Sequence, residues 1–320
     1  MWEEIIDKEP LNILAIKFAH EGYLRMGMLS EMLALTSKVL KHWKPVMPFY
    51  GQILNLHSYS LCESGRTEEA EEIAKQSQEL DGTSLRAIHS LAYVNYRRNE
   101  YAQGIQLLNS TKSLWIDSDR LSSHYLWHLA LFYIKRKDFT AAMDVWDTEI
   151  KARALAAKPD YISPLLDAAS ILMRLSMHGL SLQQRWRDLW RVFSRHLKDH
   201  VWVMNDLHVL MTAMGTNESS LVRSFKDSIQ IYIQTGKGTN HKVTKEVGLT
   251  LCEAMVCYGA ANHERVVDLT YPIRGQIHRI GGTQAQRDLF HEILISSAGK
   301  SRMPSHQKLV RQLMEEKRVP

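Results

Sequence analysis

The sequence is poor in the residues that break helices. Its 320 residues include only 8 Pro and 16 Gly, which are low counts for this length. An alternation of apolar and polar residues, the pattern of a half-buried strand, does not run beyond a few residues anywhere. These shortages argue against β-rich folds, so the sequence predicts an all-α protein.

Cysteine and long apolar runs are also scarce. Cys62, Cys252 and Cys257 are odd in number and lack the spacing of metal ligands, which is typical of reduced thiols rather than of a disulfide framework. No stretch approaches the roughly 20 apolar residues of a membrane span. The acidic residues 1–7 lack the basic and apolar regions of a signal peptide. We therefore expect a cytoplasmic protein that has no membrane partner.

An excess of charge of one sign is missing as well. The chain has 40 basic and 35 acidic residues, which are interspersed, and its net charge is only +5. Segment 185–191 sets Trp186 and Trp190 among arginines, a pattern that can stack on nucleic-acid bases. The same spacing fits a helix with a buried apolar face and a solvated basic face. We favour the helix and expect no nucleic-acid partner.

What the sequence does contain is one helix–turn–helix pattern written twice at a fixed interval. Segments 65–70 and 99–104 share a turn pattern, and their first residues, Gly65 and Asn99, lie 34 residues apart. Thirty-four residues is the period of the tetratricopeptide repeat, a helical pair whose apolar face only a neighbouring pair can cover. We predict a tetratricopeptide-like helical-repeat superhelix, that is, an α-solenoid.

A single array is expected to span residues 1–320. Its predicted parts are three clear repeats, a run of divergent helical pairs and a terminal helix, at 49–82, 83–116, 122–155, 160–298 and 305–317. Gly27 closes an earlier helical pattern as a left-handed cap. Residues 235–244 are polar and carry glycine, so they predict a linker or mobile loop. Pro272 predicts a kink in a helix over 263–279.

Several segments give the chain a resemblance to the tetratricopeptide repeat protein 38 family. They are residues 18–20, 124–131, 165–170, 205–208 and 278–288. The Arg-Ile-Gly-Gly and Asn-Asp-Leu-His runs among them do not belong to ordinary repeats. The resemblance covers nearly the whole chain and implies a superhelical cytosolic protein without an established reaction, cofactor or client. Family members usually extend further at the N-terminus, so we expect this sequence to be a shortened form.

Stacked repeats present their first helices on one concave face, which commonly takes an extended peptide or a helix from a partner. By the repeat register, Asn55, His89 and Trp127 face this groove. His124 lies one turn before Trp127 on the same face. The leading hypothesis is a non-enzymatic scaffold that binds a protein or peptide partner through these four residues and needs no cofactor.

Histidines and acids recur on the predicted first helices and suggest an alternative. His124 and His128 are four residues apart, so both imidazoles face one side at a separation that suits a shared metal. Two ligands do not make a site, and histidines at helix starts more often bond neighbouring backbone or acids. The alternative is a small-molecule or metal-binding pocket, catalytic or not, built from His124, His128, Asp167, Asp206, His208, Arg279 and Arg287.

The Gly-Gly-Thr run at 281–283 predicts a tight turn into a helix that is capped by the Thr283 hydroxyl. Free N–H groups at such a turn can hold an anion flanked by Arg279 and Arg287. The other reading is a structural turn in which one of these arginines pairs with an acid such as Asp268 or Asp288.

The N-terminal end of the predicted array lacks the polar outer face that a terminal repeat needs. Leu11, Leu14 and Phe18 are apolar residues of its first helix. We therefore predict self-association of the chain through that end.

Overall fold

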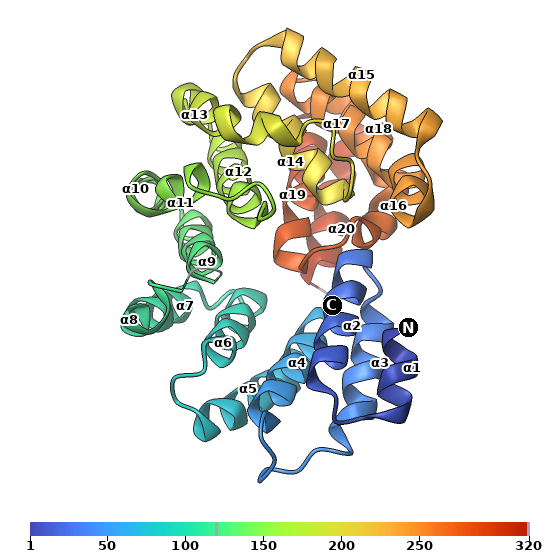
Figure 1. Cartoon of the computed structure of the whole chain (residues 1–320). Helices are drawn as coiled ribbons and strands as arrows, with labels where there is room; N and C mark the ends of the chain where they lie inside the picture. Colours follow the sequence, from blue (N-terminus) through green and yellow to red (C-terminus); the bar gives the residue numbers. More distant parts are fainter. Residues whose placement is uncertain (119–120, 319–320) are drawn as a thin grey trace. The chain divides into compact units, whose positions relative to one another are not determined.

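The computed structural model describes residues 1–118 and 121–318, and within these residues it is helical without any strand. Helices that follow one another along the chain pack as neighbours (Figure 1). The all-α fold class is confirmed, and the row of neighbouring helices is consistent with an α-solenoid. Among the described residues, none of the helices combines the length and the apolar character that a membrane crossing requires.

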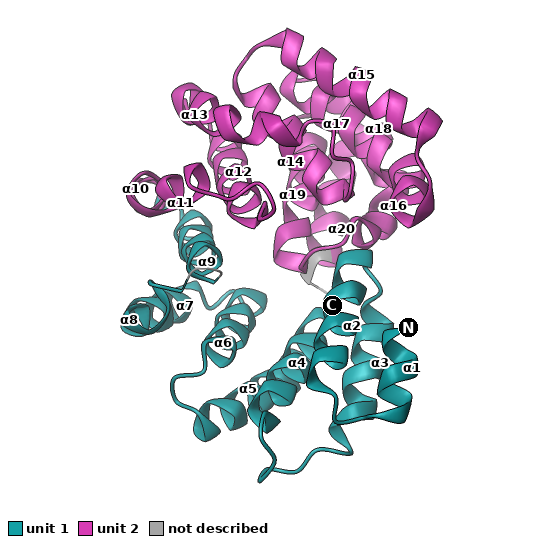
Figure 2. Cartoon of the chain, viewed as in Figure 1, with its two compact units in different colours: residues 1–138, 320 teal, residues 139–319 magenta. Residues whose placement is uncertain are grey.

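The chain divides into two compact units, residues 1–138 and residues 139–319 (Figure 2). The division falls inside the predicted repeat 122–155, at the turn between its two helices. Where we expected a single array, the structure has two compact helical units, and each is described by itself.

Unit 1 consists of consecutive helices that fill the predicted repeats. In chain order they are α1 (Trp2–Lys8), α2 (Ile13–Met26), α3 (Leu29–Leu40), α4 (Tyr50–Glu63), α5 (Thr67–Leu80), α6 (Leu85–Arg97), α7 (Tyr101–Ser110), α8 (Lys112–Trp115) and α9 (Ser122–Lys135). Helices α4 and α5 occupy the predicted repeat 49–82, and α6 and α7 lie within 83–116. The pair α2 and α3 precedes them.

One turn geometry joins the helices of each pair. Gly27, Gly65, Asn99 and Lys137 have φ values of 68°, 79°, 60° and 62°. After each of them, the amide of the next residue donates to the carbonyl five residues earlier, as in Met28 N to Tyr23 O and Arg66 N to Leu61 O. The amides of Glu100 and Asp138 make the same bond to Asn95 O and Tyr133 O. This is the Schellman helix end. Because it recurs, positions in different pairs can be compared by counting from the turn residue.

Small residues let the helices of unit 1 approach closely. Seven positions before the turn residue stand Ser58 and Ala92, and five positions after it stand Ala70 and Gly104; all four are buried. A Cβ atom on Gly104 would meet the ring of Phe132 at 2.5 Å. Helices α7 and α9 therefore touch at a place where only glycine fits.

Unit 2 continues the alternation of helices. In chain order it has α10 (Phe139–Val145), a π-helical turn (Trp146–Ile150), α11 (Lys151–Leu155), α12 (Ser163–Met177), α13 (Gln183–Phe193), a 3₁₀ turn (Ser194–His196), α14 (Val203–Gly215), α15 (Ser219–Thr235), α16 (Gly238–Val243), a second π-helical turn (Thr244–Gly248), α17 (Leu249–Gly259), α18 (His263–Ile273), a 3₁₀ helix (Arg274–Ile280), α19 (Gln284–Lys300) and α20 (Pro304–Arg318). Left-handed residues also end helices here, at Gly179, Asn217 and Ala261.

The linker predicted over 235–244 is wrong, because α16 lies there. The Asn240 side chain accepts from the Val203 amide at 3.1 Å and donates to the His200 carbonyl at 2.7 Å. These bonds hold the polar segment against the start of α14. Its polarity serves contacts within the fold rather than solvation.

The C-terminal elements follow the prediction with one change. Helix α18 ends one residue after Pro272 and continues as a 3₁₀ helix, so the predicted kink is a change of helix type. This fits the missing N–H of proline. The terminal helix expected over 305–317 is confirmed as α20, where Leu313 is buried against α19 with Leu294 and Ala298.

Candidate functional site

Three histidines of unit 1 lie together on neighbouring first helices. His89 comes from α6, and His124 and His128 come from α9. One ring nitrogen of each lies within 4.8 Å of the others, and the Nε2 atoms of His89 and His128 are 3.2 Å apart. The structure thus adds His89 to the pair predicted from its spacing, and we call these three residues the histidine cluster.

The repeat register explains why the three residues meet. His89 stands ten residues before the turn residue Asn99, and His128 stands nine before the turn residue Lys137. Nearly equivalent positions on the adjacent first helices α6 and α9 face each other, because these helices pack together. The four-residue spacing of His124 and His128 then places both rings on the face toward α6.

Aromatic side chains frame the cluster. The Trp127 ring stacks on His124, with centroids 5.1 Å apart and planes 8° apart. Tyr59 stacks on His89 at 5.7 Å, and the edge of Tyr125 faces it at 6.0 Å. Trp127 and Tyr125 are fully buried. Aromatic rings thus contact His89 and His124 directly.

Burial sets the charge of the cluster. Burial first, and then the neighbouring charge of His124, holds the pKa of both His89 and His128 well below the ordinary histidine value. Both rings are therefore neutral at pH 7. His89 and His124 keep some exposed surface, whereas His128 is only 1% exposed. Its Nδ1 atom has no hydrogen-bond partner in the part of the chain that the structure describes.

The predicted partner-binding residues differ in exposure. Asn55 is 3% exposed and donates to the Ser84 hydroxyl at 3.3 Å, and Trp127 is 0% exposed. These two side chains are covered by their neighbours and offer no surface to a partner, so we correct the prediction that they contact it. His89 and His124 remain partly exposed. The partner itself stays a prediction.

The other residues of the alternative pocket belong to unit 2, while His124 and His128 belong to unit 1. Asp167 on α12 and Asp206 and His208 on α14 are each 2% exposed. His208 Nδ1 lies 2.7 Å from the Met204 carbonyl, and burial lowers the pKa of His208 to about 4. These three residues are interior groups of their unit, and the pocket that would join them to α9 stays a prediction.

The Gly-Gly-Thr turn is a helix cap. The Thr283 hydroxyl accepts from the Gln286 amide at 3.1 Å, and the Gln286 side chain accepts from the Thr283 amide at 2.9 Å, which makes a capping box. This confirms the predicted cap and uses amides that an anion would need. Arg287 donates to the Gly282 carbonyl, and Arg279 pairs with Glu246. The pairing of Arg279 with an acid is thus confirmed, although the acid is Glu246.

Sequence reasoning missed a network that joins His200 to α14 and α15. His200 bonds the Asp206 carboxylate through Nδ1 at 2.9 Å and the Ser228 hydroxyl through Nε2 at 2.8 Å. This order of acid, imidazole and hydroxyl resembles a hydrolase triad. Ser228, however, lies in the middle of α15, where the backbone amides are bonded within the helix and cannot stabilise an oxyanion. We interpret the network as the partner set of the buried Asp206.

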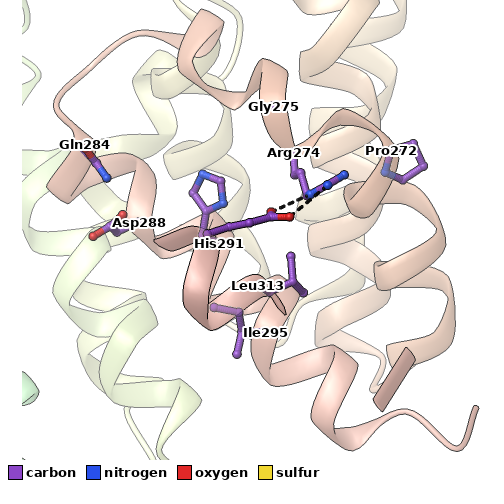
Figure 3. A pocket seen from close by; sticks show the side chains of 9 residues that line it. Pro272, Arg274, Gly275, Gln284, Asp288, His291, Ile295 and Leu313 are labelled. Carbon is purple, nitrogen blue, oxygen red and sulfur yellow. Dashed lines mark hydrogen bonds and ion pairs between the residues drawn. The ribbon is translucent and has the colours of Figure 1, made fainter. Parts of the chain in front are cut away.

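A pocket in unit 2 was also missed, and Figure 3 shows it. Its volume is about 420 Å³. The residues that line it are Pro272, Arg274, Gly275, Gln284, Asp288, His291, Ile295, Leu313 and Glu316. Arg274 donates to both Glu316 oxygens, at 2.9 and 3.2 Å. The charges of Arg274 and Glu316 thus neutralise each other at the wall of the pocket.

Comparisons with known proteins add no identity to these sites. No protein-family model matches the chain, and no solved structure gives a significant match to it. The function therefore has to be argued from the residues of the two units.

Proposed function

We propose that this chain is a tetratricopeptide-like scaffold that binds a protein or peptide partner on the first helices of unit 1. We further propose that it belongs to the tetratricopeptide repeat protein 38 family, acts in the cytoplasm and is not an enzyme. The observation that carries the scaffold proposal is the turn shared by Gly27, Gly65, Asn99 and Lys137. It puts consecutive helical pairs in one register, as a repeat array requires.

The register supports a common binding face. Gln52, Arg86 and His124 each stand 13 residues before a turn residue, on α4, α6 and α9. Gln52 and Arg86 are exposed and His124 is partly exposed. First helices that present polar side chains at one repeating position offer a row of contacts to an extended peptide or a partner helix. Arg86 and His124 favour a partner that carries acidic or hydrogen-bond-accepting groups.

Site-specific photo-crosslinking tests this face. A benzophenone amino acid is placed at Gln52 or Arg86 on first helices, or at Gln76 on the second helix α5 as a matched exposed control. We expect the same discrete adduct from Gln52 and Arg86 in cells that make the protein, and none from Gln76. Equal labelling from Gln76, or different adducts at the two first-helix positions, would count against a shared binding face.

The alternative pocket keeps one supporting observation, the histidine cluster of unit 1. It favours metal binding as a second candidate function. Metal binding by the histidine cluster does not require the residues of unit 2 that were predicted for the alternative pocket.

A further inference from the structure

The histidine cluster has the spacing of metal ligands. Zn–N bonds are about 2.0–2.1 Å long, so two nitrogens on one tetrahedral ion lie about 3.3–3.4 Å apart. The Nε2 atoms of His89 and His128, 3.2 Å apart, match this edge. All three nitrogens lie within 4.8 Å of one another. Where two nitrogens are as far apart as 4.8 Å, their separation must shorten by about 1.4 Å to share one ion, and the partly exposed His124 ring can move by rotating.

The metal-free cluster has one contact that a metal ion would replace and one buried atom that the ion would not reach. The facing Nε2 atoms of His89 and His128 are at hydrogen-bond distance, so one ring donates a proton to the other, and an ion bound to both rings would displace this proton. His128 Nδ1 is buried and finds no hydrogen-bond partner in residues 1–118 and 121–318. Such a buried atom is uncommon, but an ion on Nε2 of the same ring does not reach it, so the facing nitrogens alone carry the case for a metal.

We propose that His89, His124 and His128 bind one divalent transition-metal ion, with Zn²⁺ as the representative. Imidazole nitrogen suits Zn²⁺, Cu²⁺ and Ni²⁺, whereas Mg²⁺ and Ca²⁺ prefer oxygen ligands. The site lies within unit 1 and requires no partner. The metal site therefore goes beyond the scaffold function, and the two proposals are tested independently.

The fourth ligand of the ion comes from outside the cluster. Three neutral imidazoles leave two positive charges uncompensated, and a buried charge is costly without an opposite one. The rings of Trp127 and Tyr125 are buried against His124 and His89, and these two histidines keep some exposed surface. A hydroxide or an anion fills the open position there, as in zinc sites with three histidines.

Cobalt titration tests the proposal. The whole chain is produced without a histidine tag, stripped with a chelator and titrated with Co²⁺, which reports four-coordination by its visible absorption, and Zn²⁺ then competes. We expect one equivalent to bind. His124→Phe keeps the ring against Trp127 but removes the ligand, and we expect affinity to fall more than about 100-fold. That exceeds the 10- to 100-fold loss caused by removing an outer-shell partner.

Two further variants separate ligation from folding. His57→Gln removes another partly exposed histidine of unit 1, which lies 3.1 Å from the Thr36 hydroxyl, and we expect unchanged metal binding. His124→Cys restores a ligand, and we expect one equivalent of Co²⁺ with a new sulfur-to-metal charge-transfer band. Because the chain also has Cys62, Cys252 and Cys257, the same titration of the wild type is the control, and a band seen only in the variant places residue 124 on the ion.

The proposal is overturned by any of three results. The wild-type chain binds no Co²⁺ saturably up to millimolar concentration, or His124→Phe binds it as tightly as the wild type does. The third is a His124→Cys protein that binds metal without the charge-transfer band. A wild-type chain that binds no Co²⁺ but still crosslinks a partner from Gln52 and Arg86 would refute the metal site and leave the scaffold proposal standing.

Discussion

Histidine plays different parts in this chain because its surroundings differ. His20 on α2 is 4% exposed, and its Nε2 lies 3.2 Å from the Leu56 carbonyl and 3.1 Å from the Ser60 hydroxyl. It is a structural residue that links α2 to α4. In the histidine cluster the rings face one another instead. The sequence around each histidine does not tell a structural histidine from a clustered one.

His20 predicts a loss of stability in acid. Burial lowers the pKa of His20 to about 4, below the ordinary 6.5, so the unfolded chain takes up the proton first. The stability is fully present above pH 6.5 and falls as the pH drops from 6.5 toward 4. For this one residue the loss is about 2 kcal/mol at pH 5.

Urea denaturation of wild type and His20→Gln at pH 7 and pH 5 measures this term. We expect His20→Gln to be less stable at pH 7 but to lose less free energy of unfolding on acidification. Equal losses in the two proteins would show that His20 is not buried as a neutral ring.

At the scale of helices, the sequence carried most of the information. The 34-residue interval between the turn residues Gly65 and Asn99 located α4 to α7, because these signals are local and repeat. Helix α16 was missed because its polar residues, Asn240 above all, bond to a segment some 40 residues earlier. The close contact of Gly104 with Phe132 also depends on a distant segment, so no local pattern shows it.

That contact yields an element-scale prediction. In Gly104→Ala the new methyl group overlaps the Phe132 ring, and overpacking of this kind costs about 1–3 kcal/mol. Gly22→Ala on α2 is the matched control, since its added methyl has no neighbour within 4 Å. Its better helix propensity stabilises by about 1 kcal/mol.

Thermal denaturation of both variants makes the comparison. We expect a lower melting temperature for Gly104→Ala and an unchanged or higher one for Gly22→Ala. Stabilisation by both substitutions would contradict the close approach of α7 and α9.

At the scale of the whole molecule, unit 1 begins with an exposed apolar patch. Leu11, Leu14 and Phe18 are 48%, 62% and 44% exposed, and the Trp2 ring stacks on Phe18 at 5.2 Å. Exposed apolar clusters at the end of a helical array favour association. A second copy of the chain is the partner that we predict for this patch.

Sedimentation velocity at micromolar concentration measures the association. We expect a dimer for the wild type and a monomer for the Leu14→Glu, Phe18→Glu double variant. Val46→Glu, at an exposed apolar residue between α3 and α4, should remain dimeric. A monomeric wild type would refute the prediction.

The sequence alone could not assemble the candidate site. The spacing of His124 and His128 was visible, and the register placed His89 on the same face. Their convergence depends on the packing of α6 against α9, which no local pattern encodes. The same limit applies to Asn55 and Trp127, whose burial follows from neighbouring helices. The division at residues 138 and 139 likewise reflects contacts across the whole chain.

The scaffold proposal is tested most directly by calorimetry with the partner that crosslinking recovers. The full chain, its His89→Ala, His124→Ala double variant and a Gln76→Ala control are titrated with that partner in the presence of a chelator. Truncation of a hot-spot residue in an interface costs about 2 kcal/mol or more. We expect the double variant to bind at least about 10-fold more weakly and the control to bind as the wild type does. Unchanged affinity in the double variant would contradict binding on the first helices of unit 1.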